Sequence, residues 1–251
     1  MQDNLKNMNI ETFGIPLSIY PYSNKSLIIN WLTSSNGLTS TILNINSKNN
    51  FNKTFSLFAT SKLNISNNSN KNLHKIIECE MIDSRNDFKK CWRSTQCASY
   101  LTYLFNQTIP EHTIDNEFYN LFEQSLDLAM IYGHEPYFLI WTELNFTEKQ
   151  GHKPKLDKCI FCGNHNTMRF SASQGGVCCE KCIKKNNIYS FPLNKNTKNI
   201  LNYIQESKDI NKLQNLKITK NELEDIDLII GTFMNITYQL HPNHRNSVLK
   251  I

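Results

Sequence analysis

Four cysteines in two pairs constrain this chain more than any other feature of its sequence. Cys159 and Cys162 form one C-x₂-C pair, and Cys179 and Cys182 form a second pair after sixteen intervening residues. Two residues between cysteines allow both thiolates of a pair to reach one metal ion, and four thiolates in a tetrahedron suit Zn²⁺. Because such a site has no open coordination position, we expect one structural zinc ion per chain.

Other interpretations of these cysteines stay open. The four thiols could be reduced and unliganded, or they could hold an iron–sulfur cluster, although the symmetric spacing favours zinc. Cys178 has an allowed spacing to Cys182 and competes with Cys179 as the third ligand, and His165 is a weaker competitor. We favour Cys179, because it completes the symmetric pair.

The composition excludes some classes of protein. The chain has 251 residues, of which 39% are hydrophobic, and no apolar run reaches the length of about 18 residues that a membrane span needs. The first 14 residues include Asp3, Glu11 and several Asn but no apolar segment, so we expect no secretory signal and no disulfide framework. A net charge of +5 is compatible with nucleic acid as a partner but does not require one.

The sequence also lacks the short motifs that mark common enzymes. It contains no phosphate-binding loop, no dinucleotide-binding glycine motif, no nucleophile elbow and no zinc deaminase signature. These absences do not exclude an enzyme, but nothing in the sequence motifs argues for one.

The pattern of apolar residues predicts an α+β protein that begins with a small β-barrel. Up to about residue 82, short runs of β-branched and aromatic residues predict five strands, two of them joined by a turn at Asn36-Gly37. The last two strands are expected at 54–58 and 74–81, with an exposed loop at 64–72. Five short strands in about eighty residues favour a barrel.

Helical periodicity begins near Ser84, where residues 84–87 resemble a capping box. Helices are predicted over 88–107, 116–132, 136–150, 194–206 and 220–240, with His241-Pro242 ending the last. Within the cysteine-rich segment, residues 168–171 and 175–178 could pair as a hairpin. The predicted domains are the barrel at 1–82, the helical domain at 83–155 and 190–251, and a zinc-ribbon module at 156–189.

This order of parts resembles the RecO family of bacterial recombination mediator and repair proteins. The segments that carry the resemblance are Tyr22, 33–37, 98–101, 135–144, 151, 159–163, 170–182, 238–241 and Ser247. The cysteine block with its internal Phe-Ser and Gly-Gly is the specific part of the match, whereas the match in the barrel is loose.

The resemblance implies an OB-fold barrel that binds single- and double-stranded DNA, and a protein that anneals complementary strands without covalent chemistry. It further implies a place in the RecF pathway, in the bacterial cytoplasm at the nucleoid. The implied partners are RecR and the C-terminal tail of the single-strand-binding protein. The implied role is to load RecA onto DNA that is coated with the single-strand-binding protein. The candidate DNA contacts are Lys25, Trp31, Lys48, Lys53 and Lys62, with Phe51 and Phe55 as further stacking candidates, and the candidate partner contacts are Arg93 and Arg245.

The chain departs from the family pattern just after Ile45, where members usually carry a segment rich in Arg and Lys. Residues 44–50 contain one lysine, Lys48, and each missing phosphate contact lowers both the affinity for DNA and its salt dependence. For any single candidate lysine, and for the pair Lys184-Lys185, an ordinary solvated side chain is the favoured interpretation. A second hypothesis is therefore a scaffold that acts through protein partners, and a third is a zinc-ribbon enzyme whose catalytic residues cannot be identified.

Overall fold

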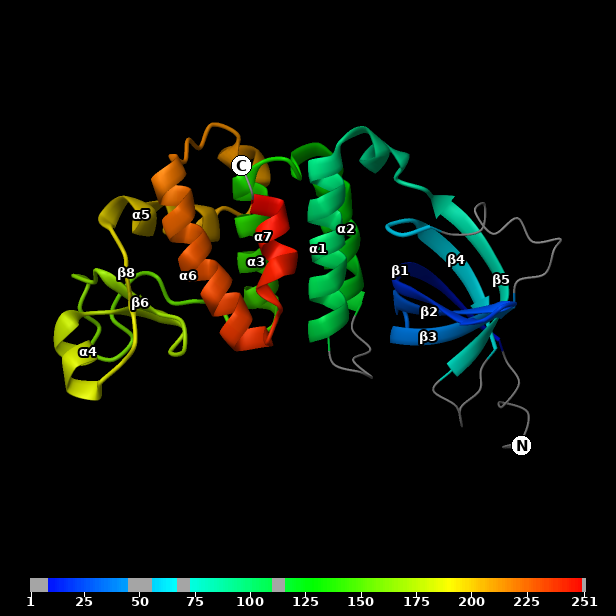
Figure 1. Cartoon of the computed structure of the whole chain (residues 1–251), viewed down its shortest axis with the longest axis horizontal. Helices are drawn as coiled ribbons and strands as arrows, with labels where there is room; N and C mark the ends of the chain where they lie inside the picture. The colour runs from blue at the N-terminus through cyan, green and yellow to red at the C-terminus, as the bar shows by residue number, and fades with distance from the viewer. Residues whose placement is uncertain (1–8, 45–55, 67–72, 110–115, 250–251) are drawn as a thin grey trace. The chain divides into compact units, whose positions relative to one another are not determined.

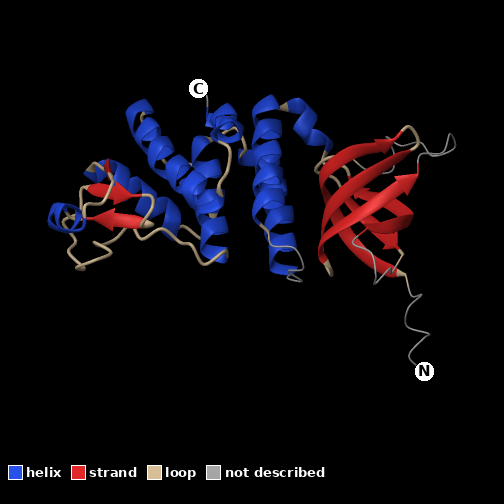
Figure 2. Cartoon of the chain, turned by 60° about the horizontal axis from the view of Figure 1, so that its bottom comes forward, coloured by secondary structure: helices blue, strands red, loops and turns tan. Residues whose placement is uncertain are grey.

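The computed structural model describes residues 9–44, 56–66, 73–109 and 116–249. Tertiary contacts divide the chain into two compact units, Met1–Ile131 and Tyr132–Ile251. The first unit holds a five-stranded barrel and a pair of helices, and the second holds further helices and a small sheet beside the cysteines (Figures 1 and 2). Among the described helices, none is long and apolar enough to cross a membrane. The domain boundaries expected after residues 82, 155 and 189 stay predictions.

The first unit begins with a closed barrel, in which the strands are joined in the order β1-β2-β3-β5-β4. The strands are β1 (Ile10–Ser23), β2 (Ser26–Thr33), β3 (Gly37–Asn44), β4 (Thr60–Ile65) and β5 (Leu73–Asp83). Neighbouring strands are antiparallel except β3 and β5, which are parallel. A five-stranded barrel followed by helices confirms the predicted fold class, with an OB-fold at the N-terminal end.

Alternating side chains of the strands fill the barrel. Its buried core consists of Ile29, Trp31, Leu63, Ile65 and Ile76. The indole N–H of Trp31 donates a hydrogen bond to Thr41 Oγ1 at 2.8 Å, so the polar atom of this large side chain is satisfied inside the barrel. Gly14 makes room for this packing, because a Cβ atom there would lie 2.7 Å from Leu63 Cδ1 and 3.2 Å from Trp31 Cε3.

The predicted turn between β2 and β3 is confirmed, but the predicted fourth strand is wrong. Thr33 pairs with Gly37, which adopts a φ of 62° that favours glycine. Residues 57–58 form a turn, and the fourth strand follows at 60–65, so it overlaps the predicted loop only at 64–65. Leu63 and Ile65 enter the core, while Lys62 before them is exposed and Asn64 between them is half-buried.

Helix α1 (Trp92–Thr108) begins later than predicted, and helix α2 (Asn116–Tyr132) lies where predicted. The capping box expected at 84–87 is wrong, because Arg85 adopts a left-handed φ of 42° and makes no side-chain cap. A short 3₁₀ helix, η3 (Asn86–Lys90), forms instead and packs Phe88 against Phe58, with ring centroids 5.1 Å apart.

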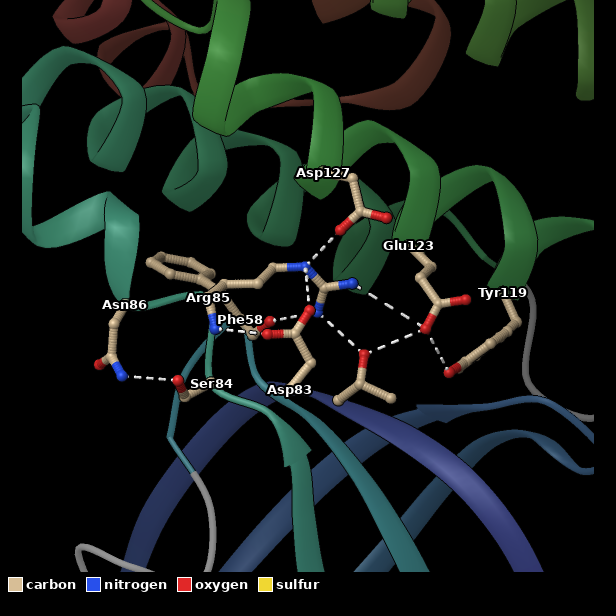
Figure 3. Close-up of polar contacts among 9 residues, drawn as sticks. Phe58, Asp83, Ser84, Arg85, Asn86, Tyr119, Glu123 and Asp127 are labelled. Carbon is tan, nitrogen blue, oxygen red and sulfur yellow. Dashed lines mark hydrogen bonds and ion pairs between the residues drawn. The ribbon is translucent and has the colours of Figure 1, made fainter.

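Arg85 connects the barrel to helix α2 (Figure 3). Its side chain is 2% exposed and donates hydrogen bonds to Asp127 Oδ1 at 2.7 Å, to the Phe58 carbonyl at 2.8 Å and to Thr60 Oγ1 at 2.9 Å. Glu123, also on α2, lies 3.9 Å from the same guanidinium. One buried cation therefore satisfies acceptors from the turn before β4, from β4 itself and from α2.

We expect Arg85→Met to lower the free energy of unfolding by about 2 to 3 kcal/mol, because the Phe58 carbonyl and Thr60 lose their buried donor. The cost stays below that of a fully buried ion pair, since the Asp127 side chain is 50% exposed and water can solvate it. Urea denaturation followed by circular dichroism measures the change. Arg93→Met is the matched control, because Arg93 is exposed, and its expected change is within about 0.5 kcal/mol. Equal losses in both variants would contradict the stabilising role of the buried Arg85.

The second unit contains several helices and a small three-stranded sheet of order β7-β6-β8. Its elements are α3 (Pro136–Lys149), β6 (Arg169–Ser171), β7 (Gly176–Cys178), α4 (Glu180–Asn186), β8 (Phe191–Pro192), α5 (Lys195–Glu206), η4 (Ile210–Leu213), α6 (Lys220–Tyr238) and α7 (Pro242–Leu249). The three predicted helices of this unit are confirmed within about two residues. The helix predicted to be the last does end before His241, but a further helix, α7, starts at Pro242.

Helix α7 is joined to the rest of the second unit by a buried ion pair. Glu143 on α3 is completely buried, and its two carboxylate oxygens accept hydrogen bonds from Arg245 on α7 at 2.7 and 2.9 Å. A further nitrogen of the same guanidinium pairs with Asp227 on α6. The prediction that Arg245 contacts a partner protein is therefore wrong, because its side chain is 5% exposed and is bound within the unit.

Candidate metal centre and nucleic-acid interface

The two cysteine pairs meet in the second unit. Cys159 and Cys162 lie in the segment after α3, Cys179 is the N-cap of α4, and Cys182 lies within α4. Their four sulfur atoms all lie within 4.8 Å of one another, and those of Cys162 and Cys179 are 3.6 Å apart. Four thiolates around one Zn²⁺ at about 2.3 Å place the sulfur atoms about 3.8 Å apart, so the donor set fits this ion.

The backbone around the first pair stabilises the thiolate form of Cys159. The N–H of Cys179 donates to Cys159 Sγ at 3.4 Å, and the N–H of Gly163 donates to the Cys159 carbonyl at 2.9 Å. Although burial opposes ionisation, backbone hydrogen bonds from Cys179, Phe161 and Cys162 lower the pKa of Cys159 to about 6. A thiolate is the form that binds a metal ion.

Cys182, in the second pair, keeps its proton when no metal ion is bound. A hydrogen bond shared with Cys162, together with desolvation and contacts to the other thiols, raises the pKa of Cys182 to about 12. A metal ion replaces that proton with its own positive charge, so binding is expected to release protons.

Two other candidate ligands lie outside the cluster. Cys178 is buried on β7, where its sulfur donates to the Gly176 carbonyl at 3.6 Å, and burial raises its pKa to about 11. The imidazole of His165 is exposed and lies 3.5 Å from Asp157. Cys179 is therefore the member of the second pair that joins the cluster, and β6 and β7 form the predicted hairpin before it.

The two candidate lysines of the barrel that the structure describes, Lys25 and Lys62, lie on different elements. Lys25 is exposed in the turn between β1 and β2, whereas Lys62 on β4 lies 3.6 Å from Glu11 and opposite Glu80 in the sheet. The prediction that Trp31 stacks on a base is wrong, because its ring is completely buried in the barrel core. Four further candidates lie outside the described residues, namely Lys48, Phe51, Lys53 and Phe55.

Tyr20 and Tyr22 are better placed for stacking than Trp31. They lie near the end of β1, close in sequence to Lys25, and are 51% and 65% exposed. Residue types alone do not single them out, because an aromatic residue on a strand is equally compatible with the core. Their position in the strand indicates exposure, because β1 continues past the buried part of the barrel into a turn.

The candidate partner residue Arg93 is accessible. It lies in the first turn of α1, and its guanidinium carbon is 5.9 Å from the centroid of the Trp92 ring. Trp92 is 61% exposed, so the two side chains form a small surface pair.

Comparison with known protein families assigns this architecture. The family model described as "Recombination protein O N terminal" matches residues 8–85, and the model described as "Recombination protein O C terminal" matches residues 92–246. The chain belongs to the RecO family. Membership of the RecO family places it among proteins of DNA repair and recombination.

Curated proteins of the same family are similar over large parts of the chain. A DNA repair protein RecO of Thermoanaerobacter sp. (strain X514) is 28% identical over 167 residues, which are 65% of this chain and 66% of that protein. One from Caldanaerobacter subterraneus subsp. tengcongensis is 24% identical over 183 residues, 72% of this chain and 73% of the relative. A third, from Dehalococcoides mccartyi, is 31% identical over 103 residues, 40% of each chain. The match to the first relative thus spans just under two thirds of its length.

Proposed function

We propose that this chain is a non-enzymatic mediator of DNA recombination and repair, which binds single-stranded DNA and anneals complementary strands. The observation that carries the proposal is the match of both RecO family models to consecutive parts of the chain. A five-stranded barrel of the kind that binds single strands supports it, as do the exposed tyrosines at one end of β1. Annealing needs no covalent step, since phosphate contacts that exchange readily can hold two strands together.

On the same family assignment we propose RecR and the C-terminal tail of the single-strand-binding protein as partners. The activity would then be the loading of RecA onto coated DNA in the RecF pathway, and its site of action would be the nucleoid in the cytoplasm. Double-stranded DNA is a further proposed ligand.

We also propose that the four-cysteine cluster holds one Zn²⁺ ion. The ligands would be Cys159, Cys162, Cys179 and Cys182, whose sulfur atoms are already close together and include an acidified thiol. With four protein ligands the ion would be structural: it would connect the segment after α3 to α4.

We expect the chain to accelerate annealing of complementary oligonucleotides that are coated with single-strand-binding protein. The acceleration should fall as salt rises, because each phosphate contact on a single strand contributes about −0.7 to the slope of log affinity against log salt. Annealing rates at low and at physiological salt, with and without RecR, measure this. A folded, metal-loaded chain that gives no acceleration in either condition would contradict the mediator proposal.

A scaffold that acts through protein partners is the second candidate, and the charge of the barrel favours it. Lys62, one of the candidate DNA contacts, is flanked by Glu11 and Glu80, which reduce its attraction for phosphate. Binding of RecR or of the single-strand-binding protein in a pull-down, without any mobility shift of DNA, would distinguish the scaffold from the mediator.

A further inference from the structure

The cysteine module is more basic for its length than the barrel. Residues 1–83 contain seven basic and five acidic residues, whereas residues 156–190 contain five basic and two acidic residues in less than half the length. The basic residues of the module are Lys158, Arg169, Lys181, Lys184 and Lys185. Because phosphate contacts supply much of the affinity for nucleic acid, the module is a place to look for such contacts.

A concave site of about 280 Å³ lies on this module, lined by residues of α4, of β6 and of the segment after α4. Figure 1 shows α4 beside the small sheet. Its lining combines two cations, one carboxylate, apolar side chains and one tyrosine. The lining residues are Arg169, Glu180, Ile183, Lys184, Ile188, Tyr189 and Ser190. This volume is at the lower end of small-ligand sites, which suits one planar group better than a folded partner.

Arg169 is held in a fixed orientation at this site. Its Nε donates to Ser190 Oγ at 2.9 Å, and its Nη2 donates to the Ser190 carbonyl at 2.6 Å. Within the described part of the chain, Nη1 makes no hydrogen bond. A guanidinium that is already oriented, with a donor left over, loses little conformational entropy when it binds a phosphate.

Tyr189 supplies an aromatic surface beside these cations. Its side chain is 77% exposed, more than any other large hydrophobic side chain among the described residues. Its backbone carbonyl accepts from Ser171 Oγ at 2.9 Å, and its ring contacts Phe191 edge-on, with centroids 5.3 Å apart. Single exposed apolar residues are common and carry little meaning, but this one shares a pocket with Arg169 and Lys184.

We propose that this pocket binds single-stranded DNA, with Arg169 and Lys184 contacting phosphate groups and Tyr189 stacking on a base. The inference rests on the proposed function and adds a contact surface outside the barrel. Glu180 in the same wall can accept the amino hydrogens of a cytosine, a pairing that the carboxylates of an acidic peptide do not offer. Since Cys182 lies in α4 two residues before Lys184, the metal ligands and the pocket share one short helix.

Binding of fluorescein-labelled oligo-dC to the full-length, metal-loaded chain tests this site by anisotropy. Tyr189→Ala should weaken binding roughly tenfold, and Tyr189→Phe should retain it, because stacking needs only the ring. Lys184→Glu should make the slope of log affinity against log salt less steep by about 0.7 or more, because a phosphate contact is lost. Lys181→Glu is the matched control, since it makes the same charge change on α4 outside the pocket.

Crosslinking to an oligonucleotide that carries 5-iododeoxyuridine locates the contact independently of affinity, and attachment at or beside Tyr189 supports the site. If the wild-type chain binds no DNA, the proposed function fails and this site fails with it. If the wild type binds but Tyr189→Ala and Lys184→Glu match the Lys181→Glu control, with crosslinks elsewhere, only this site is overturned. The site is also overturned if these substitutions weaken the binding of an acidic peptide and leave the binding of DNA unchanged. Lys184→Gln replaces Lys184→Glu if circular dichroism shows misfolding.

Discussion

Replacing Arg245 with Met is expected to lower the free energy of unfolding by about 3 to 5 kcal/mol. The reason is Glu143, which is completely buried and receives two hydrogen bonds from the Arg245 guanidinium. Methionine retains much of the length of the side chain but leaves the carboxylate buried without its cation. Urea denaturation followed by circular dichroism and by the fluorescence of Trp141, which lies on the same helix as Glu143, measures the loss.

A double variant separates lost charge from lost packing. Arg245→Met combined with Glu143→Leu removes both charges, and removal of a whole buried pair is often close to neutral. We therefore expect the double variant to recover much of the loss, although Asp227 also loses its contact with Arg245. An equal loss in the single and double variants would show that the ion pair is not the cause.

Replacing Cys159 with Ser is expected to abolish stoichiometric zinc binding and to destabilise the cysteine module by several kcal/mol, on the order of what structural zinc sites contribute. Cys159 is the ligand whose thiolate is stabilised by three backbone N–H groups, and serine replaces a soft thiolate with a poor ligand. Metal analysis by mass spectrometry and thermal unfolding give the two readouts.

Cys178→Ser is the matched control for this substitution. Cys178 is buried one position before Cys179, but its sulfur lies outside the four-cysteine cluster. The control should retain one zinc ion per chain, even if serine packs less well on β7. Zinc retained by Cys159→Ser, or lost by Cys178→Ser, would contradict the ligand set.

Features that depend on neighbouring residues could be predicted from the sequence. The spacing of the cysteines predicts a cluster, and the structure brings the same four sulfur atoms together. The Asn36-Gly37 turn and the helices after residue 116 follow from local backbone preferences and apolar periodicity in the same way. The turn, the helices and each cysteine pair depend on residues a few positions apart, and only sixteen residues separate the two cysteine pairs.

The burial of Trp31, the position of β4 and the role of Arg245 depend on residues that are distant in the sequence. Alternation along β2 puts Trp31 on the same face as Ile29, but only closure of the barrel decides that this face is inside. In β4 the polar residues Ser61, Lys62 and Asn64 outnumber the apolar Leu63 and Ile65 and make the strand resemble a loop. Arg245 looks like any surface arginine until Glu143, 102 residues earlier, is placed beside it.

That separation has a consequence for how the second unit is made on the ribosome. At about 5 to 20 residues per second, the arginine that neutralises Glu143 is synthesised roughly 5 to 20 s after it, because it lies 102 positions later in the chain. Until then helix α3 carries an uncompensated carboxylate on the face that it will bury, so it should remain hydrated in the nascent chain. Completion of this core is thus coupled to the emergence of helix α7, and a chain that stalls before that point should be a ready substrate for proteases.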